Sequence, residues 1–130
     1  MVISKKKVTP KCAIRIGNQT IKQVTRFKYL ESMLTSDGKS DTEIKNRMGM
    51  AKEAFQNMSK ILKNQNITMD TRKRILACYI YPILTYGSES WTISPCMERR
   101  LEATEMWFYR RMLNISWAQH VRNVNVLKSK

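Results

Sequence analysis

Alternating apolar and polar side chains mark the first third of the chain. In the segment KCAIRIGNQTIKQV, apolar residues at every second position predict a strand, and the Gly17-Asn18 pair predicts a two-residue hairpin turn. Ile21 resumes the pattern on the far side of that turn. A second alternation places Phe27 and Tyr29 on one face of a further extended segment, and residues 36–39 (SDGK) predict the turn that follows.

From residue 40 onward, apolar residues recur at steps of three and four, which is the period of an α-helix. The first predicted helix begins at Ser40 and ends near Asn64. Its start has the form of a capping box, in which Ser40 accepts from a backbone amide and Glu43 reaches back. The apolar stripe of this helix consists of Ile44, Met48, Ala51, Phe55, Met58 and Leu62.

Two longer helices and one short helical segment are predicted after Thr68. The second helix has Asp70 in its first turn, a kink or restart at Pro82 and a C-terminal cap at Gly87. Its apolar face consists of Ile75, Leu76, Tyr79, Ile80, Ile83 and Leu84. The third helix has Ser94 as its cap, Pro95 at its first position and a stripe of Met97, Leu101, Thr104, Phe108 and Met112. A short segment after Asn123 holds Val124 and Leu127.

These patterns predict an α+β protein that is predominantly helical. An N-terminal antiparallel β-hairpin or small sheet is followed by a bundle of three to four helices. A length of 130 residues suits one domain with a single core. The longest apolar stretch, residues 75–86, is too short to cross a bilayer.

The charge of the chain indicates a polyanionic partner. It carries 24 Lys and Arg against 10 Asp and Glu, a net charge of +14, so nucleic acid is the first candidate and an anionic membrane surface the second. Basic residues cluster at 5–7, 72–74, 99–100 and 110–111. Each cluster alone is typical of solvated surface, but together they predict phosphate contacts. Three tryptophans and a tyrosine lie among the arginines and are candidates for base stacking, although for Trp107 a place in the core is the simpler interpretation: Trp91, Trp107, Trp117 and Tyr109.

The acidic residues do not form the cluster that two-metal phosphoryl transfer requires. Asp37, Asp41 and Asp70 stand singly where a turn or a helix cap uses them. The glutamates at 89, 98, 102 and 105 are interpreted as partners of Arg99 and Arg100 on a helix surface. Three unpaired cysteines and one histidine, His120, do not suggest a zinc site, and they favour reduced thiols in the nucleus or cytoplasm.

Five segments in order resemble the C-terminal part of reverse transcriptases from non-LTR retrotransposons, of the endonuclease-reverse-transcriptase type found in long interspersed elements. They read MVIS, IRIGNQTIKQVTRFKYLES, SDGKSDTEIKNRMGMAKEAF, YGSESWT and RRLEATEMWFYRRMLNISW. The resemblance implies that residues 1–36 are strands at the edge of the palm with a primer-grip-like segment, and that 37–130 are a helical thumb truncated at its C-terminus. Glu31 stands where the family pattern has glycine, and a carboxylate there would repel a phosphate backbone.

The resemblance also implies a function. The chain is expected to be a fragment of an RNA-directed DNA polymerase that holds RNA, DNA or their hybrid, without catalysis of its own, because the catalytic aspartate pair of the palm is missing. Mg²⁺ is expected only for the full-length polymerase, and the missing palm and fingers are expected protein partners, with no membrane and no small-molecule ligand. The expected nucleic-acid-binding residues are Lys5, Lys6, Lys7, Arg26, Phe27, Lys28, Tyr29, Leu30, Arg72, Lys73, Arg110 and Arg111. Two alternatives stay open: a protein-protein interaction module, and a non-functional pseudogene product of a mobile element.

Overall fold

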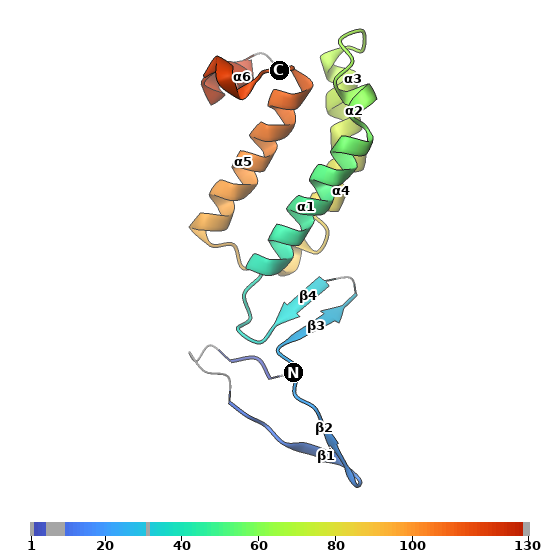
Figure 1. Ribbon diagram of the computed structural model, residues 1–130, viewed down its shortest axis with the longest axis vertical. Coiled ribbons are helices and arrows are strands. Elements are labelled where there is room, and N and C mark those ends of the chain that lie inside the picture. The colour runs from blue at the N-terminus through green and yellow to red at the C-terminus, as the bar shows by residue number, and fades with distance from the viewer. Residues whose placement is uncertain (1, 5–9, 31, 129–130) are drawn as a thin grey trace.

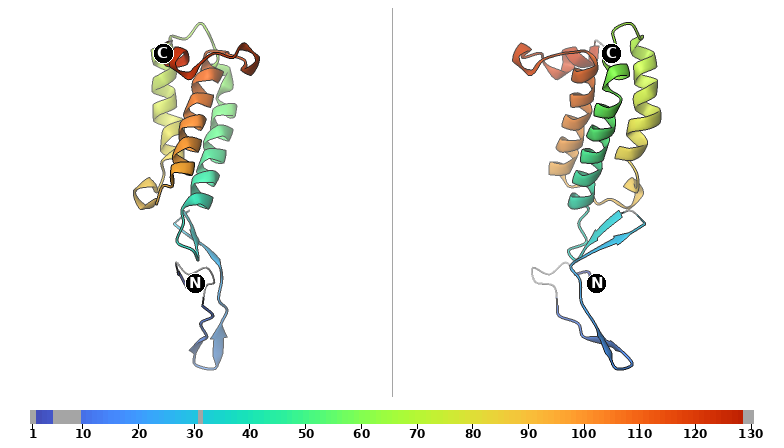
Figure 2. Two further views of the ribbon diagram at one scale, coloured as in Figure 1. Left: turned by 90° about the vertical axis from the view of Figure 1, so that its left-hand side faces the viewer. Right: turned by 45° about the vertical axis from the view of Figure 1, so that its right-hand side comes forward.

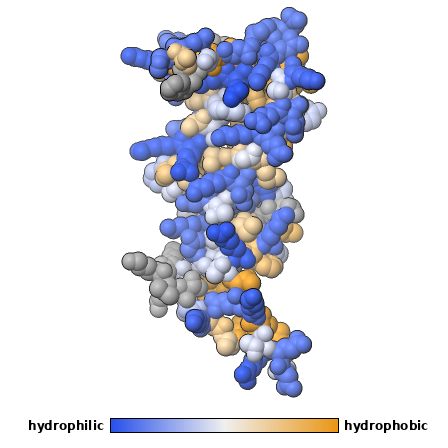
Figure 3. All heavy atoms as spheres, viewed as in Figure 1, coloured by the Kyte–Doolittle hydropathy of each residue, from blue (hydrophilic) through white to orange (hydrophobic). Residues whose placement is uncertain are grey.

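The computed structural model describes residues 2–4, 10–30 and 32–128. Two small β-hairpins lie at one end of the molecule and a bundle of helices at the other (Figure 1). The predicted α+β class with a predominance of helix is therefore confirmed. Hydrophilic side chains cover most of the face of the bundle in Figure 3, whereas apolar side chains gather over the strands.

Each hairpin is a separate two-stranded antiparallel sheet. Strand β1 (Ile14–Ile16) pairs with β2 (Gln19–Ile21), and Gly17 between them has a φ of 59°, which confirms the predicted turn. Strand β3 (Arg26–Tyr29) pairs with β4 (Ser32–Thr35), a strand that the alternation pattern did not indicate. Every residue of β1 and β2 is exposed to solvent.

The turn predicted at residues 36–39 is present. Asp37 accepts hydrogen bonds from the Thr35 hydroxyl and from the backbone amide of Lys39, and Gly38 has a φ of 66°. The hydrogen bond from Thr35, followed by that from the Lys39 amide, lowers the pKa of Asp37 below its ordinary value of 3.8.

The first predicted helix is divided in two. Helix α1 (Asp41–Asn57) is separated from α2 (Ser59–Leu62) by a single residue, Met58. The predicted capping box is wrong. The Ser40 hydroxyl accepts from the backbone amide of Thr92 and makes no cap bond, while the Glu43 carboxylate is buried and bonds to Arg47 and to the amide of Met33. The two hydrogen bonds of a capping box are therefore replaced. Ser40 bonds to Thr92, and Glu43 bonds to Met33 and to Arg47 of its own helix.

The second predicted helix contains a π-helical turn. Thr68 caps α3 (Met69–Ile75) through its side chain, η1 (Leu76–Ile80) follows as π-helix, and α4 (Tyr81–Leu84) completes the rod. Pro82 has no backbone N–H and its ring disfavours an ordinary α-turn before it, which accounts for the widened turn. Tyr79 is 61% exposed, so its predicted place on the apolar face is wrong. Gly87, with a φ of 72°, ends this region before a short 3-10 turn, η2 (Ser88–Ser90).

The third predicted helix is confirmed in its start and its stripe. Helix α5 (Pro95–Met112) starts at Pro95, and the hydroxyl of Ser94 accepts from the amide of Met97. A 3-10 turn, η3 (Trp117–Gln119), leads to α6 (Asn123–Lys128), whose buried residue is Val126. Within the described residues no ion pair joins the glutamates of this region to Arg99 or Arg100, so that pairing is wrong.

One core unites the bundle. Helix α1 packs against both α4 and α5, and the three rods stand side by side in the two views of Figure 2. Phe55 of α1 lies at the centre, with its ring 5.3 Å from that of Trp107 and 5.3 Å from that of Phe108. The largest fully buried side chains are Phe55, Phe108, Ile44, Leu62, Leu76, Ile80, Met112 and Val126. The apolar stripes predicted for the first and third helices therefore meet in this core.

Candidate nucleic-acid interface

An open cleft lined by basic side chains lies at the C-terminal end of α5. It has a volume of about 870 Å³, and among the described residues no acidic one contributes to its lining. Lys63 reaches it from the end of α2, Arg110 and Arg111 from α5, and His120 from the loop after η3. The cleft thus combines the cations Lys63, Arg110 and Arg111 from two separate segments with His120 from a third, and among the described residues a phosphate group placed there would face no carboxylate.

Trp107 forms one wall of this cleft and also contacts the core. Its ring makes edge contacts with Phe55 and Phe108. The Arg111 guanidinium lies 5.1 Å and the Lys52 ammonium 5.8 Å from the centre of the Trp107 ring. Both contacts are within the range of cation-π attraction, so the ring holds two cations near the cleft. Trp107 therefore serves the core and the cationic surface at once.

Arg110 fixes the segment that closes the cleft. Its guanidinium donates to the Val121 carbonyl at 2.6 Å and to Asn123 Oδ1 at 2.8 Å. These bonds tie α5 to the beginning of α6. Arg110, which the sequence predicted to bind phosphate, thus also makes hydrogen bonds that hold the fold together. Its guanidinium lies at the wall of the cleft.

Arg72 lies in the interior and not on the surface. It is 4% exposed, and its guanidinium donates to the Met112 carbonyl at 2.6 Å and to the Leu62 carbonyl at 3.4 Å. These carbonyls belong to the last residues of α5 and α2, where backbone acceptors lack helical partners. The prediction that Arg72 contacts nucleic acid is therefore wrong for this conformation. Its cation instead joins the two helix ends that carry Arg111 and Lys63.

A second, smaller cleft of about 500 Å³ lies between the β3–β4 hairpin and α1. Lys28 enters it from β3, and Lys45 and Arg47 enter it from α1. Glu43 also lines this cleft, but its carboxylate is joined to Arg47 Nε at 2.7 Å. The cleft therefore keeps a net positive lining.

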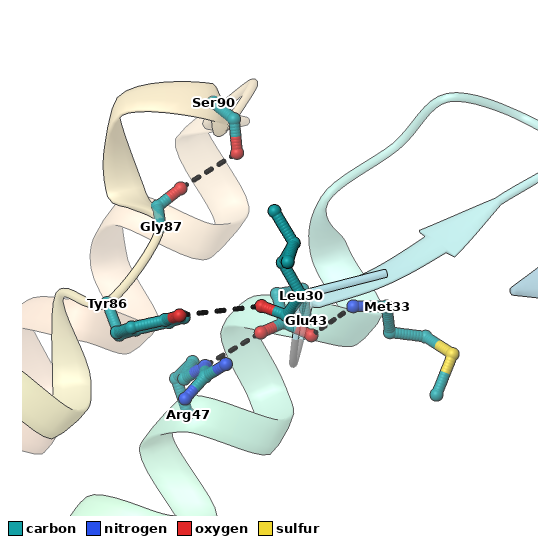
Figure 4. Close-up of polar contacts among 7 residues, drawn as sticks. All are labelled: Leu30, Met33, Glu43, Arg47, Tyr86, Gly87 and Ser90. Carbon is teal, nitrogen blue, oxygen red and sulfur yellow. Dashed lines mark hydrogen bonds and ion pairs between the residues drawn. The ribbon is translucent and has the colours of Figure 1, made fainter. Parts of the chain in front are cut away.

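The hairpin is attached to the bundle through its turn. The Glu43 carboxylate accepts from the Met33 amide at 2.8 Å, and the Tyr86 hydroxyl donates to the Leu30 carbonyl at 3.5 Å (Figure 4). The Arg47 guanidinium lies over the Tyr86 ring, 4.5 Å from its centre. Leu30 itself has a φ of 46° and is 73% exposed. The segment that resembles a primer grip thus includes the tip of the hairpin, and this tip is the end held by side chains of the helical bundle.

Lysines of α1 connect the two clefts. Lys45 and Lys52 are seven residues apart, so they share one helix face with a separation of about 10 Å. Lys45 lines the smaller cleft, and Lys52 lies over Trp107 at the larger one. We call the resulting surface the basic track. Its residues are Lys28, Lys45, Lys52, Lys63, Arg110 and Arg111.

The structure unites some of the residues predicted from the sequence and separates others. Lys28, Arg110 and Arg111 belong to the basic track. The remaining residues of the grip-like segment, Arg26, Phe27, Tyr29 and Leu30, are exposed on the same hairpin. Lys73 pairs with Asp70 at 3.3 Å and lines neither cleft. Lys5, Lys6, Lys7 and Glu31 lie outside the described residues, as does the side chain of Trp117.

Sequence reasoning missed Lys45, Arg47, Lys63 and His120 in the two clefts, and also Lys52, which lies over Trp107 and lines neither cleft. Lys45 and Lys52 had a usable signal, because their spacing of seven places them on one helix face. Lys63 and His120 had none, since only the folded bundle brings them beside Arg110. Tyr109, predicted as a stacking residue, is buried in the core, and its hydroxyl lies 3.2 Å from that of Tyr81.

Two further observations describe the chemistry of the described part of the chain. No group of three His, Cys, Asp or Glu side chains there is arranged to hold a metal ion. None of its helices combines the length and the apolar character needed to span a bilayer.

Comparison with known proteins gives one similarity of interest. A putative uncharacterized transposon-derived protein of Caenorhabditis elegans is 29% identical to this chain over 96 residues. The match covers 74% of this chain, which spans about a third (34%) of the length of that relative. No family model matches the chain. No solved structure matches it either. The similarity indicates that the chain has a mobile-element origin.

Proposed function

We propose that this chain is the palm edge and thumb of a non-LTR retrotransposon reverse transcriptase, and that it holds the template-primer duplex along the basic track. The five sequence segments described above and the transposon-derived relative support the assignment. A thumb binds the backbone of a duplex without reading its sequence, and a line of lysines and arginines suits that task. The partners under this proposal are RNA, DNA or their hybrid, together with the palm and fingers of the parent polymerase.

Segregation of charge on the bundle is the observation that carries this proposal. Within the part of the chain that the structure describes, the cleft at the end of α5 is lined by Lys63, Arg110, Arg111 and the His120 imidazole, and by no carboxylate. The carboxylates of α5 lie instead around a different groove, beside α4. Because the cations of the track are collected from β3, α1, α2 and α5, they form a surface in the folded protein that no single cluster of the sequence provides.

The test is a fluorescence-anisotropy titration of a labelled RNA-DNA hybrid with the full chain at several salt concentrations. Each phosphate neutralised in a duplex contributes about −0.9 to the slope of log affinity against log salt. The triple variant Lys45→Ala, Lys52→Ala and Lys63→Ala should therefore reduce the magnitude of that slope by about 2 to 3.

The matched control removes the same charge elsewhere. Lys22, Lys39 and Lys60 are exposed and line neither cleft, so their triple alanine variant should keep most of the affinity. Equal losses in both variants would show that only the total charge matters and would contradict a defined track. A slope near zero for the unaltered chain would overturn nucleic-acid binding altogether.

Under this proposal the chain is not a polymerase by itself. The catalytic aspartate pair and its Mg²⁺ would belong to the parent polymerase, upstream of this segment. Primer extension by the purified chain in the presence of Mg²⁺ and deoxynucleotides measures this directly. We expect no extension, and any template-dependent product would refute the assignment.

A protein-protein interaction module is the second candidate function, and the β1–β2 hairpin favours it. Ile14, Ile16 and Ile21 are 54%, 69% and 47% exposed, and the register of the hairpin places all three on one face. A two-stranded hairpin is at best marginally stable in water without a partner for its apolar face. Purification of the chain as a stable, nucleic-acid-free monomer at high concentration would speak against this candidate.

A further inference from the structure

A groove of opposite character to the basic track lies between α4 and α5. It has a volume of about 730 Å³ and is more apolar than the clefts of the track. Leu84, Trp91, Ile93 and Leu101 supply apolar lining. Three carboxylates also line it, those of Glu98, Glu102 and Glu105, and no lysine or arginine does so among the described residues. In a chain with a net charge of +14, this groove is a local acidic and apolar surface.

The acidic character of the groove is maintained by its surroundings. The Tyr81 hydroxyl donates to Glu105 Oε1 at 3.3 Å. Burial, and then the contacts with Tyr109 and Glu105, raise the pKa of Tyr81 well above its ordinary value, so the phenol stays protonated and remains a donor. Glu98 and Glu102 are exposed, and neither is held in an ion pair within the described part of the chain. Their charges are therefore available to a cationic partner.

The same chain carries a segment of complementary chemistry. The β1–β2 hairpin presents its three isoleucines on one face, and Arg15 and Lys22 lie on the other. No acidic residue occurs in residues 10–30. Arg15 and Lys22 point away from the isoleucine face, so their charges would act on a partner of that face across the single layer of strands, at a range that salt screens over roughly 8 Å. The hairpin thus combines an apolar face with a net positive charge, whereas the groove combines apolar lining with three carboxylates.

We propose that two copies of this chain associate by placing the β1–β2 hairpin of each copy in the α4–α5 groove of the other. The groove is formed by α4, the loop after it and the first half of α5. The β3–β4 hairpin adjoins this end of the bundle, and the β1–β2 hairpin projects beyond it, away from the helices (Figure 1). A two-fold arrangement makes the same contact twice and closes the assembly as a dimer. The contact would cover the exposed isoleucines, and it does not depend on nucleic acid.

The experiment is sedimentation velocity of the nuclease-treated full chain over a range of concentrations. The unaltered chain should pass from monomer to dimer as its concentration rises. Glu102→Lys, which reverses a charge of the groove, and Ile16→Ser, at a position 69% exposed, should each weaken dimerisation at least tenfold. Neither residue is buried in the core, and circular dichroism should show that both variants remain folded.

The matched control is Glu89→Lys, because Glu89 is exposed and does not line the groove although the charge change is the same. This variant should dimerise like the unaltered chain. A mixture of Glu102→Lys with the double variant Arg15→Glu and Lys22→Glu should recover association through the reversed charges. A monomer at all concentrations, or an equal effect of Glu89→Lys and Glu102→Lys, would overturn the proposal and leave nucleic-acid binding by the basic track unaffected.

Discussion

Replacement of Arg72 by methionine should destabilise the bundle, and the structure allows the size of the effect to be worked out. Methionine is long and apolar, so Arg72→Met removes the guanidinium without leaving a large cavity. The bond to the Met112 carbonyl is short, at 2.6 Å, and a hydrogen bond made by a charged group contributes about 1.5–3 kcal/mol. A cation beside the C-terminal ends of two helices adds about 0.3–1 kcal/mol at each end.

The opposing effect is the cost of burying the cation. Arg72 is 4% exposed, and within the described residues no carboxylate pairs with it and its Nε makes no hydrogen bond. Removing a buried charge with imperfect partners recovers part of its desolvation cost. We expect the lost bonds to exceed this gain, because Met112 and Leu62 would keep buried carbonyls without a donor. The expected net loss is about 2 kcal/mol in the free energy of unfolding.

Urea unfolding followed by circular dichroism is the assay. With a slope of about 1–3 kcal/mol per molar for a protein of this class, a loss of about 2 kcal/mol lowers the midpoint by roughly 1 M. Arg74→Met is the matched control, since Arg74 is exposed on the same helix and its replacement should change stability by less than about 0.5 kcal/mol. If Arg72→Met leaves the midpoint unchanged or raises it, desolvation outweighs the two carbonyl bonds and the reasoning is refuted.

Four more predictions concern helix α1, two turns and the core. Gly49→Ala should raise the free energy of unfolding by about 0.5–1 kcal/mol, because a Cβ there meets nothing within 4 Å on α1. Gly87→Ala should lower the free energy of unfolding by about 1–2 kcal/mol, because a residue with a Cβ is strained at the φ of 72°. Urea midpoints that shift in the same direction for Gly49→Ala and Gly87→Ala would contradict these two predictions. Phe108→Ala should cost about 3–5 kcal/mol in thermal or urea unfolding, and a cost below about 1 kcal/mol would mean that Phe108 is not central to the core. Thr35→Val should raise the pKa of Asp37 toward 3.8 in an NMR titration, because the main bond that lowers it is lost. The stabilisation that this carboxylate provides is present above its unfolded pKa and lost as the pH falls through the lowered folded value, and an unchanged pKa in the variant would exclude the Thr35 bond as its cause.

The elements that could be predicted from the sequence were those whose signals are local. Helix α5 has a capping serine, a proline at its first position and an apolar stripe, all within one segment, and the structure confirms each of them. The Gly17-Asn18 turn was equally local. Strand β4 carried no alternation of its own and is recognised only through its pairing with β3.

The predictions that failed did so because tertiary partners competed with local ones. Glu43 has the spacing of a capping box, yet it is buried beside Arg47 and the Met33 amide, and a buried carboxylate bonds to the strongest donors within reach. Arg72 stands beside Lys73 and Arg74 in the sequence, and nothing in that triplet distinguishes the buried cation from the two at the surface. The large cleft required the bundle itself, because its cations Lys63, Arg110 and Arg111 come from the end of α2 and from α5.

The π-helical turn before Pro82 changes the direction in which the side chains of α4 point. The amide of Tyr81 bonds to the carbonyl of Leu76, five residues back, so the turn holds one residue more than an α-turn would. Each residue of a helix advances the direction of its side chain by about 100°, and the additional residue therefore changes the phase of every side chain that follows. In the phase that results, Tyr81 reaches Glu105 and Tyr109 on α5. The face that α4 presents to the acidic groove thus depends on one inserted residue several positions earlier in the chain.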